Sequence, residues 1–181
     1  MLAVAAIAMV PQAVAADVFR NKTDGYQIAI PPGWTKTEPP HGQKRGFLVL
    51  EPSGTGSTGE NCRVGAYRDP GTARQTQDQI NAGMRDGTVL REDRASKDKE
   101  ETVVGGGPMQ LAGGIVGLTV DKTRPFSYLL FFRSTMRLRE LDVRVPGRGY
   151  LVICVVLDAD YPSQRKTLDQ IFTSFEPVAQ K

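Results

Sequence analysis

Two short segments near opposite ends of this chain constrain its fold more than any other feature. The first, Gly25–Trp34, reads GYQIAIPPGW and alternates apolar with polar or small residues until a double proline. This period of two predicts a half-buried strand, which ends at the prolines because they cannot donate to a ladder. The second segment, about Ser163–Phe175, predicts an amphipathic helix with one buried face. Its apolar side chains recur at helical spacing: Leu168, Ile171, Phe172 and Phe175.

The last third of the sequence carries the densest strand pattern. Four runs separated by turn residues predict an antiparallel meander: 114–120, 126–135, 138–145 and 149–157. The stretches 128–132 and 151–157 are continuously apolar, which predicts strands covered on both faces. Earlier in the chain, Ala73, Gln77, Ile80 and Met84 recur at helical spacing and predict a helix that ends near Gly87.

The first residues predict export from the cytoplasm. Residues 1–16 read MLAVAAIAMVPQAVAA, an apolar run followed by a small-x-small pattern before the first charge at Asp17. The run is too short to span a membrane and fits a secretory signal peptide, although no Lys or Arg precedes it. A buried N-terminal helix is the alternative. We therefore expect a signal peptide over 1–16, a single domain over 17–181, no transmembrane segment, and a periplasmic or secreted location.

Charge and cysteine content narrow the class of protein further. The chain has 23 basic and 20 acidic residues, and this net charge of +3 is too small to imply a nucleic-acid partner. Its two cysteines, Cys62 and Cys154, both lie in strand-like segments. In an oxidising compartment they are a candidate disulfide, which would stabilise the fold by roughly 4 kcal/mol. Two buried free thiols are the alternative.

No pattern of catalytic residues is present in the sequence. The only histidine, His41, lies in a loop rich in proline and glycine. The sequence contains no GxSxG, HExxH, CxxC or phosphate-cradling motif, so we expect no catalytic residue and no cofactor. Asp158 and Asp160 could begin a cation site, but calcium needs six to eight oxygen ligands. Forming a turn and capping the following helix is the simpler role for this pair, so we expect no metal site.

Five arginines gather in the predicted meander: Arg133, Arg137, Arg139, Arg144 and Arg148. Arg137 and Arg139 share a strand face if the period of two holds there. Together with Arg144 they are candidate partner-binding residues, able to dock an acidic protein surface or anionic lipid. A solvated basic face that protects a sheet edge from aggregation is the alternative.

The order of these segments resembles the PsbP superfamily, which includes PsbP and Mog, and in particular its exported bacterial members. The matching pieces run along nearly the whole chain after the leader: Val18-Phe19, GYQIAIPPGW, GGGPMQLAGG, FSYLLFFR, GYLVICVVL and LDQIFTSFEP. The resemblance implies an α+β fold, an α/β/α sandwich with a central, mainly antiparallel sheet flanked by helices. It also implies action by binding rather than by catalysis.

These observations lead to one leading hypothesis and one alternative. The chain is expected to be an exported, non-enzymatic PsbP-like domain that binds a partner protein in the cell envelope. The alternative is a carrier of a small ligand or cation, using a pocket between the sheet and the helices.

Overall fold

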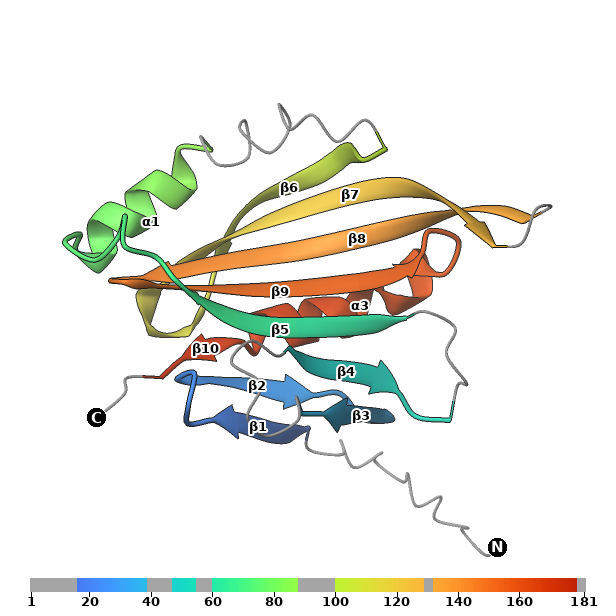
Figure 1. The fold of residues 1–181 in the computed structure, drawn as a ribbon, viewed down its shortest axis with the longest axis horizontal. Coiled ribbons are helices and arrows are strands. Elements are labelled where there is room, and N and C mark those ends of the chain that lie inside the picture. Colours follow the sequence, from blue (N-terminus) through green and yellow to red (C-terminus); the bar gives the residue numbers. More distant parts are fainter. Residues whose placement is uncertain (1–15, 39–46, 55–59, 88–99, 129–131, 179–181) are drawn as a thin grey trace, which may run out of the picture.

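Two antiparallel sheets make up most of the protein, as Figure 1 shows in a computed structural model. The structure describes residues 16–38, 47–54, 60–87, 100–128 and 132–178. The larger sheet has seven strands in the order β3-β4-β5-β9-β8-β7-β6. Its strands, in sheet order, are Trp34–Thr37, Leu48–Pro52, Asn61–Arg68, Arg148–Leu157, Phe132–Val145, Val116–Tyr128 and Thr102–Gln110.

A smaller sheet of three strands lies beside the N-terminal edge of the large one. Its central strand is β2 (Tyr26–Ile30), which pairs with β1 (Asp17–Asn21) and with the short β10 (Glu176–Pro177). The alternating segment therefore forms a strand, as predicted, and it turns at the double proline. Because β10 follows the last helix directly, this sheet joins the two ends of the described chain.

Pairing of β5 with β9 places Cys62 directly opposite Cys154, with Cα atoms 3.9 Å apart. The two residues are disulfide-bonded and fully buried. The bridge closes a sequence separation of 92 residues. In the chain-entropy account, a loop of this length corresponds to about 4–5 kcal/mol of stabilisation.

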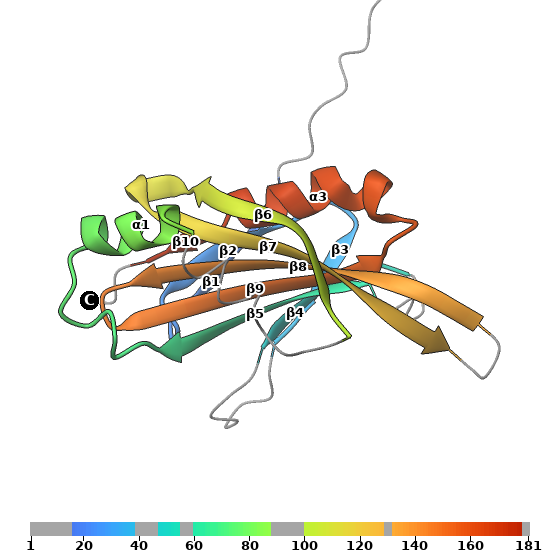
Figure 2. The same cartoon turned by 90° about the horizontal axis from the view of Figure 1, so that it is seen from above.

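Helix α3 (Tyr161–Thr173) covers one face of the large sheet, which we call the inner face (Figure 2). Side chains alternate between the two faces of a strand, and on β9 the inner set is Tyr150, Val152, Cys154 and Val156. These residues share one core with Leu168, Ile171 and Phe172 of α3. The amphipathic pattern of the C-terminal segment therefore predicted its buried side chains correctly.

Aromatic rings connect the small sheet to this core. Tyr26 of β2 stacks on Phe175, with ring centroids 5.6 Å apart, and meets the edge of Tyr150 at 6.1 Å. The Tyr150 hydroxyl donates to the Gly25 carbonyl oxygen at 2.9 Å, and the Ala29 N–H donates to the Ser174 hydroxyl at 3.0 Å. These bonds hold the small sheet against the large sheet and the end of α3.

Helix α1 (Gln77–Arg85) contacts the opposite face, which we call the outer face. A capping box between Thr76 and Gln79 begins the helix. Its Met84 packs on three residues at the start of β7: Val116, Leu118 and Val120. The buried Asn81 side chain donates to the Gly114 carbonyl oxygen and accepts from the Val116 N–H, which fixes the helix at this end of the sheet.

The expected α/β/α sandwich is wrong. The described residues contain ten strands but only two α-helices, of 9 and 13 residues. Helix α1 packs on the start of β7, at one end of the outer face, so no helical layer covers the rest of that face in the described part of the chain. Before β5, the segments β2 and β4 bury every second side chain, and they pair as strands rather than form helices.

The meander is confirmed, but two of its details differ from the prediction. The run 126–135 belongs to two strands, because Phe126 pairs with Ser134 and Tyr128 with Phe132. The hairpin turn therefore falls at residues 129–131, which lie outside the described residues. The run 151–157 is covered on one face only, since Leu151, Ile153 and Val155 are half-buried on the outer face. No helix among the described residues is long and apolar enough to cross a membrane.

Candidate binding site on the outer sheet face

The outer face of the large sheet combines half-buried aliphatic side chains with exposed aromatic rings. Leu151, Ile153 and Val155 of β9 lie in its middle. Phe47 and Tyr67, on the side toward β4 and β5, are 47% and 40% exposed. A group of such side chains on one face is a candidate interaction surface.

Two glycines let the aromatic rings lie flat on this face. Gly65 of β5 lies under the Phe47 ring, and a Cβ atom added at Gly65 would collide with it. Gly149 of β9 lies under the Tyr67 ring in the same way. The glycines of these strands therefore position the exposed rings against the sheet backbone.

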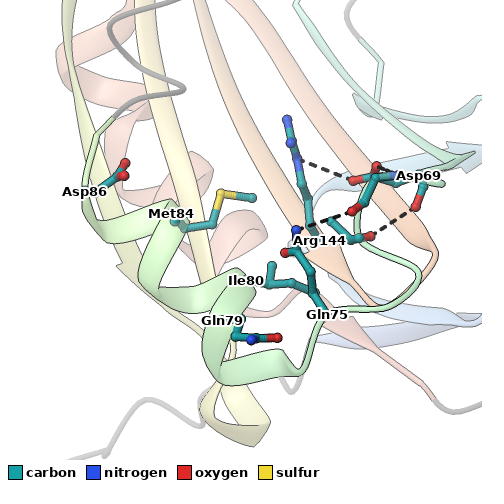
Figure 3. A pocket seen from close by; sticks show the side chains of 10 residues that line it. Asp69, Gln75, Gln79, Ile80, Met84, Asp86 and Arg144 are labelled. Carbon is teal, nitrogen blue, oxygen red and sulfur yellow. Dashed lines mark hydrogen bonds and ion pairs between the residues drawn. The ribbon is translucent and has the colours of Figure 1, made fainter.

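A hollow of about 380 Å³ lies beside α1, between the helix, the loop that precedes it and Arg144 of β8. In Figure 3, Ile80 and Met84 point from α1 toward the sheet, and Arg144 lies beside Asp69. The remaining lining residues come from α1 and from the loop that precedes it: Gly71, Thr72, Gln75, Gln79, Gly83 and Asp86.

A second hollow, of about 290 Å³, lies on the sheet itself. Its apolar lining consists of Leu118, Val120 and Leu151, with the ring of Tyr67 beside them. Arg144 lines both hollows, so they lie next to each other, and we call the two together the groove. The other lining residues of the second hollow are Glu140 and Asp142.

Arg144 stands at the centre of a polar network in the groove. Its Nε donates to Asp142 Oδ2 at 2.9 Å, and Nε lies 3.9 Å from Asp69 Oδ2. The Tyr67 hydroxyl donates to Asp142 Oδ1 at 2.9 Å. Burial and the neighbouring Asp142 charge raise the pKa of Tyr67, so its hydroxyl stays protonated and donating. Burial alone would lower the pKa of Arg144, but its hydrogen bond and attraction to Asp142 raise it.

Thr72 fixes the loop that carries Asp69. Its buried hydroxyl lies 3.1 Å from both the Asp69 and the Val145 carbonyl oxygens and accepts from the Gly147 N–H. These bonds tie the loop before α1 to the turn between β8 and β9. The Asp69 carboxylate is thereby held beside Arg144, and its Oδ2 atom is buried without a hydrogen-bond partner.

The described residues that line the groove include five charged side chains: Asp69, Asp86, Glu140, Asp142 and Arg144. Glu140 also pairs with Lys122 of β7 at 3.1 Å, beside the lining.

Of the three arginines predicted to bind a partner, only Arg144 lies in this groove. Arg137 and Arg139 share one face of β8, as the period of two predicted, but it is the inner face. Arg137 pairs with Asp158 at 2.7 Å and lies over the Tyr161 ring. Partner docking by Arg137 and Arg139 stays a prediction, and the structure favours a role in holding α3.

Arg139 is the more deeply buried of the two, with a residue exposure of 7%. It pairs with Asp121 at 3.2 Å and with Asp169 of α3, and it lies over the Phe172 ring. A guanidinium so placed connects the sheet to α3.

The other candidate residues were placed as follows. Asp160 occupies the N-cap of α3, but its side chain makes no capping hydrogen bond, and Asp158 is instead paired with Arg137. Among the described residues, no group of three or more His, Cys, Asp or Glu side chains could hold a metal ion. His41 lies outside the described residues.

Comparison with solved structures identifies the fold. Cyanobacterial PsbP (CyanoP) of Synechocystis is similar over 94% of this chain and 97% of its own, at 13% identity and a TM-score of 0.54. LpqN of Mycobacterium tuberculosis, described as involved in cell envelope biogenesis, is similar over 93% and 88%, at 10% identity and a TM-score of 0.51. A Bacteroides thetaiotaomicron protein matches at a TM-score of 0.54 and 10% identity. It covers 91% of this chain, which spans about half of that protein (49%).

The chain therefore has a PsbP-like fold, as the order of its sequence segments predicted. No protein-family model matches the sequence, and no curated protein matches it. At 10–13% identity the likeness concerns the fold, and function has to be argued from the site.

Sequence reasoning missed most of the groove. Tyr67, Asp69 and Asp142 come from separate segments and meet only through strand pairing. One pattern did mark the surface: the run 151–157 is apolar on both faces, and one of those faces lies open.

Proposed function

We propose that this protein is an extracytoplasmic PsbP-like domain that acts by binding a partner protein rather than by catalysis, and that the partner docks on the groove. The observation that carries this proposal is that the two faces of β9 are buried to different extents. Its inner side chains are buried under α3, whereas Leu151, Ile153 and Val155 remain half-buried on the outer face. Complete burial of a large aliphatic side chain stabilises by about 1.5–3 kcal/mol, so each of these partly exposed side chains retains only a fraction of that for a partner.

Export is supported by two independent observations. The sequence begins with a segment that fits a signal peptide, and the disulfide between Cys62 and Cys154 is typical of an oxidising compartment. The structural similarity to LpqN, a protein involved in cell envelope biogenesis, agrees with a place in the bacterial envelope.

A small-ligand carrier is the second candidate function. The hollow of about 380 Å³ beside α1 favours it, since pockets that hold small molecules are commonly about 300–1,000 Å³. A polypeptide partner fits better with the second hollow and with the exposed rings of Phe47 and Tyr67, which extend the apolar surface beyond the first hollow.

Site-specific photo-cross-linking tests the proposal. A benzophenone amino acid replaces Leu151 in the groove or, as the control, the exposed Thr173 on α3. In cells that make the protein, irradiation is expected to yield a discrete protein adduct from position 151 and none from position 173. The adduct should weaken when Ile153→Ser removes a neighbouring apolar side chain. Equal adducts from both positions, or none from position 151, would overturn a protein partner on this face.

A further inference from the structure

We infer that the paired ends of β7 and β8 form an arm that binds the surface of an anionic lipid bilayer. The arm consists of residues 124–128 of β7 and 132–135 of β8, which pair antiparallel with each other. It lies at the end of the sheet opposite the groove, as Figure 1 shows. The inference therefore goes beyond the proposed function and concerns a different surface.

The arm extends past the strands that flank it in the sheet. Pairing of β6 with β7 ends at Thr123, and pairing of β9 with β8 ends at Met136. Strand β7 continues to Tyr128, which at about 3.3 Å per residue adds roughly 16 Å. Figures 1 and 2 both show β7 and β8 continuing beyond the other strands. At the base of the arm, the Thr135 carbonyl oxygen accepts from the Asp158 N–H at 2.9 Å, which ties the arm to the body.

Both faces of the arm are exposed where its side chains are described. The consecutive side chains at 124–127 are all exposed, and successive residues of a strand point to opposite faces. The side chains at 134 and 135 are exposed as well. A folded partner would dock on one face of such a ribbon, whereas lipid headgroups can surround both. Exposure on both faces therefore favours a lipid surface over a folded protein.

The composition of this stretch is typical of segments that lie in the interface of a bilayer. Residues 124–135 include four aromatic residues, two leucines and two arginines, but no acidic residue. Tyrosine is enriched at membrane interfaces, and phenylalanine and leucine supply the apolar area that enters the headgroup region. Basic side chains are attracted to the negative surface of an anionic leaflet.

Arg124 and Phe126 illustrate how one face of the arm would meet lipid. They lie two residues apart on β7 and therefore share a face. The Phe126 side chain is among the exposed large apolar ones, at 36%. The Arg124 Nε atom lies 3.9 Å from Glu100 Oε2, and both side chains are mostly exposed. An exposed pair of this kind is worth little, so the guanidinium can bind a lipid phosphate instead while the ring enters the headgroup region.

Lipid binding through the arm would leave the groove accessible to a partner. Leu118 of the groove and Phe126 of the arm lie on the same strand. At about 3.3 Å per residue, the distance along β7 between them is roughly 26 Å. The protein can therefore bind a bilayer at one end of the sheet and a polypeptide at the other.

Vesicle flotation tests the arm. Protein purified from the envelope fraction is mixed with vesicles of phosphatidylcholine alone, or of equal parts phosphatidylcholine and phosphatidylglycerol. The protein is expected to float with the mixed vesicles more than with the neutral ones, and less as salt is raised. Binding to mixed vesicles should weaken about threefold in Phe126→Ser and about fivefold in Arg124→Gln. Phe126→Trp should bind at least as well as the wild type, because tryptophan favours membrane interfaces.

Phe47→Ser is the matched control. Phe47 is an exposed phenylalanine on the outer face, outside the arm, so this variant should float like the wild type. Every variant has the same N-terminus, and differences between variants therefore report the substituted side chain. Thermal melts check that each variant is folded, as expected for exposed substitutions.

Several results would overturn lipid binding by the arm. They are no flotation, equal flotation with neutral and mixed vesicles, or flotation that Phe126→Ser and Arg124→Gln leave unchanged. An equal loss in Phe47→Ser would place the lipid surface on the outer face instead of the arm. A protein adduct from a benzophenone amino acid at position 126 in cells, without flotation, would show that the arm binds a polypeptide. Cross-linking from position 151 tests the groove separately, so either surface can fail without the other.

Discussion

The two faces of the large sheet use similar strands in different ways. On the inner face, α3 and the small sheet bury the side chains of β9, and Arg137 and Arg139 pair with acidic residues there. On the outer face, α1 reaches only the start of β7 and its neighbours, and the aliphatic side chains of β9 remain half-buried. The composition of a strand therefore does not decide whether it stabilises the fold or stays available to a partner. The elements that cover each face decide it.

Substitutions on the two faces should separate these roles. Phe172→Ala removes a fully buried ring from the inner core and is expected to lower the free energy of unfolding by about 3–5 kcal/mol. Leu151→Ala removes a half-buried side chain from the outer face and should cost roughly 1 kcal/mol. Denaturant unfolding of both variants measures the difference. Equal losses would mean that the outer face contributes to the fold as much as the inner core does.

The disulfide belongs to the inner face, and its loss should affect stability without changing the groove. Replacing Cys62 and Cys154 with alanine is expected to lower the free energy of unfolding by about 2–5 kcal/mol. Cross-linking from position 151 should persist at temperatures where the variant is folded. Loss of the adduct in a folded variant would show that the two faces are coupled through β5 and β9.

Substituting one arginine on each face compares a buried ion pair with an exposed side chain. Arg139→Met leaves Asp121 without its buried partner and is expected to cost about 1–3 kcal/mol, allowing for the partial exposure of Asp169. Arg63 lies exposed on the outer face, and Arg63→Met should change stability by no more than about 0.5 kcal/mol. Thermal unfolding of both variants tests this. A stable Arg139 variant would show that the buried pair does not hold α3.

Alkaline pH should destabilise the fold through its buried tyrosines. Burial raises the pKa of Tyr26 from 10.0 to about 12. Since the unfolded chain loses this proton at lower pH than the folded protein, the contribution of Tyr26 to stability is complete below pH 10 and declines between pH 10 and 12. Tyrosinate absorbance and unfolding measured over that range check the sign. Tyr26→Phe should reduce the decline, and an unchanged decline would exclude Tyr26 as its cause.

A small gain in stability is expected from a substitution on α1. Gly83→Ala should raise the free energy of unfolding by about 0.5–1 kcal/mol, because alanine favours a helix interior and its methyl group meets open space. Thermal unfolding measures the gain. A loss of stability would mean that α1 and the sheet approach more closely at this point than the structure shows.

The spacing of apolar residues in the sequence predicted the strands and helices better than it predicted which faces of the strands are buried. Alternation in β2, the apolar stripe of α3 and the strand runs near the C-terminus each identified an element, because burial on one face leaves a period in the sequence. The α/β/α arrangement failed because period alone does not show whether a second layer lies on a strand. The continuously apolar run 151–157 implied cover on both faces, but its side chains on the outer face are only half-buried.

The groove was less predictable because its residues meet only through long-range pairing. Asp69 follows β5, whereas Asp142 and Arg144 lie on β8, and no local spacing brings these side chains together. The period of two correctly predicted that Arg137 and Arg139 lie on the same face of a strand. It could not show that α3, with Asp169 and Phe172, packs on that same face.

Hydroxyl-radical footprinting tests most directly whether the outer face is covered by a partner. Oxidation of Tyr67 and Phe47 is measured in the purified protein and in the protein within native envelope extract, each relative to Val18 and Val178. These four side chains are between 40% and 49% exposed, and the two valines lie away from the groove. The account predicts that Tyr67 and Phe47 become protected in the extract while the valines do not. Equal oxidation of Tyr67 and Phe47 in both samples would contradict it.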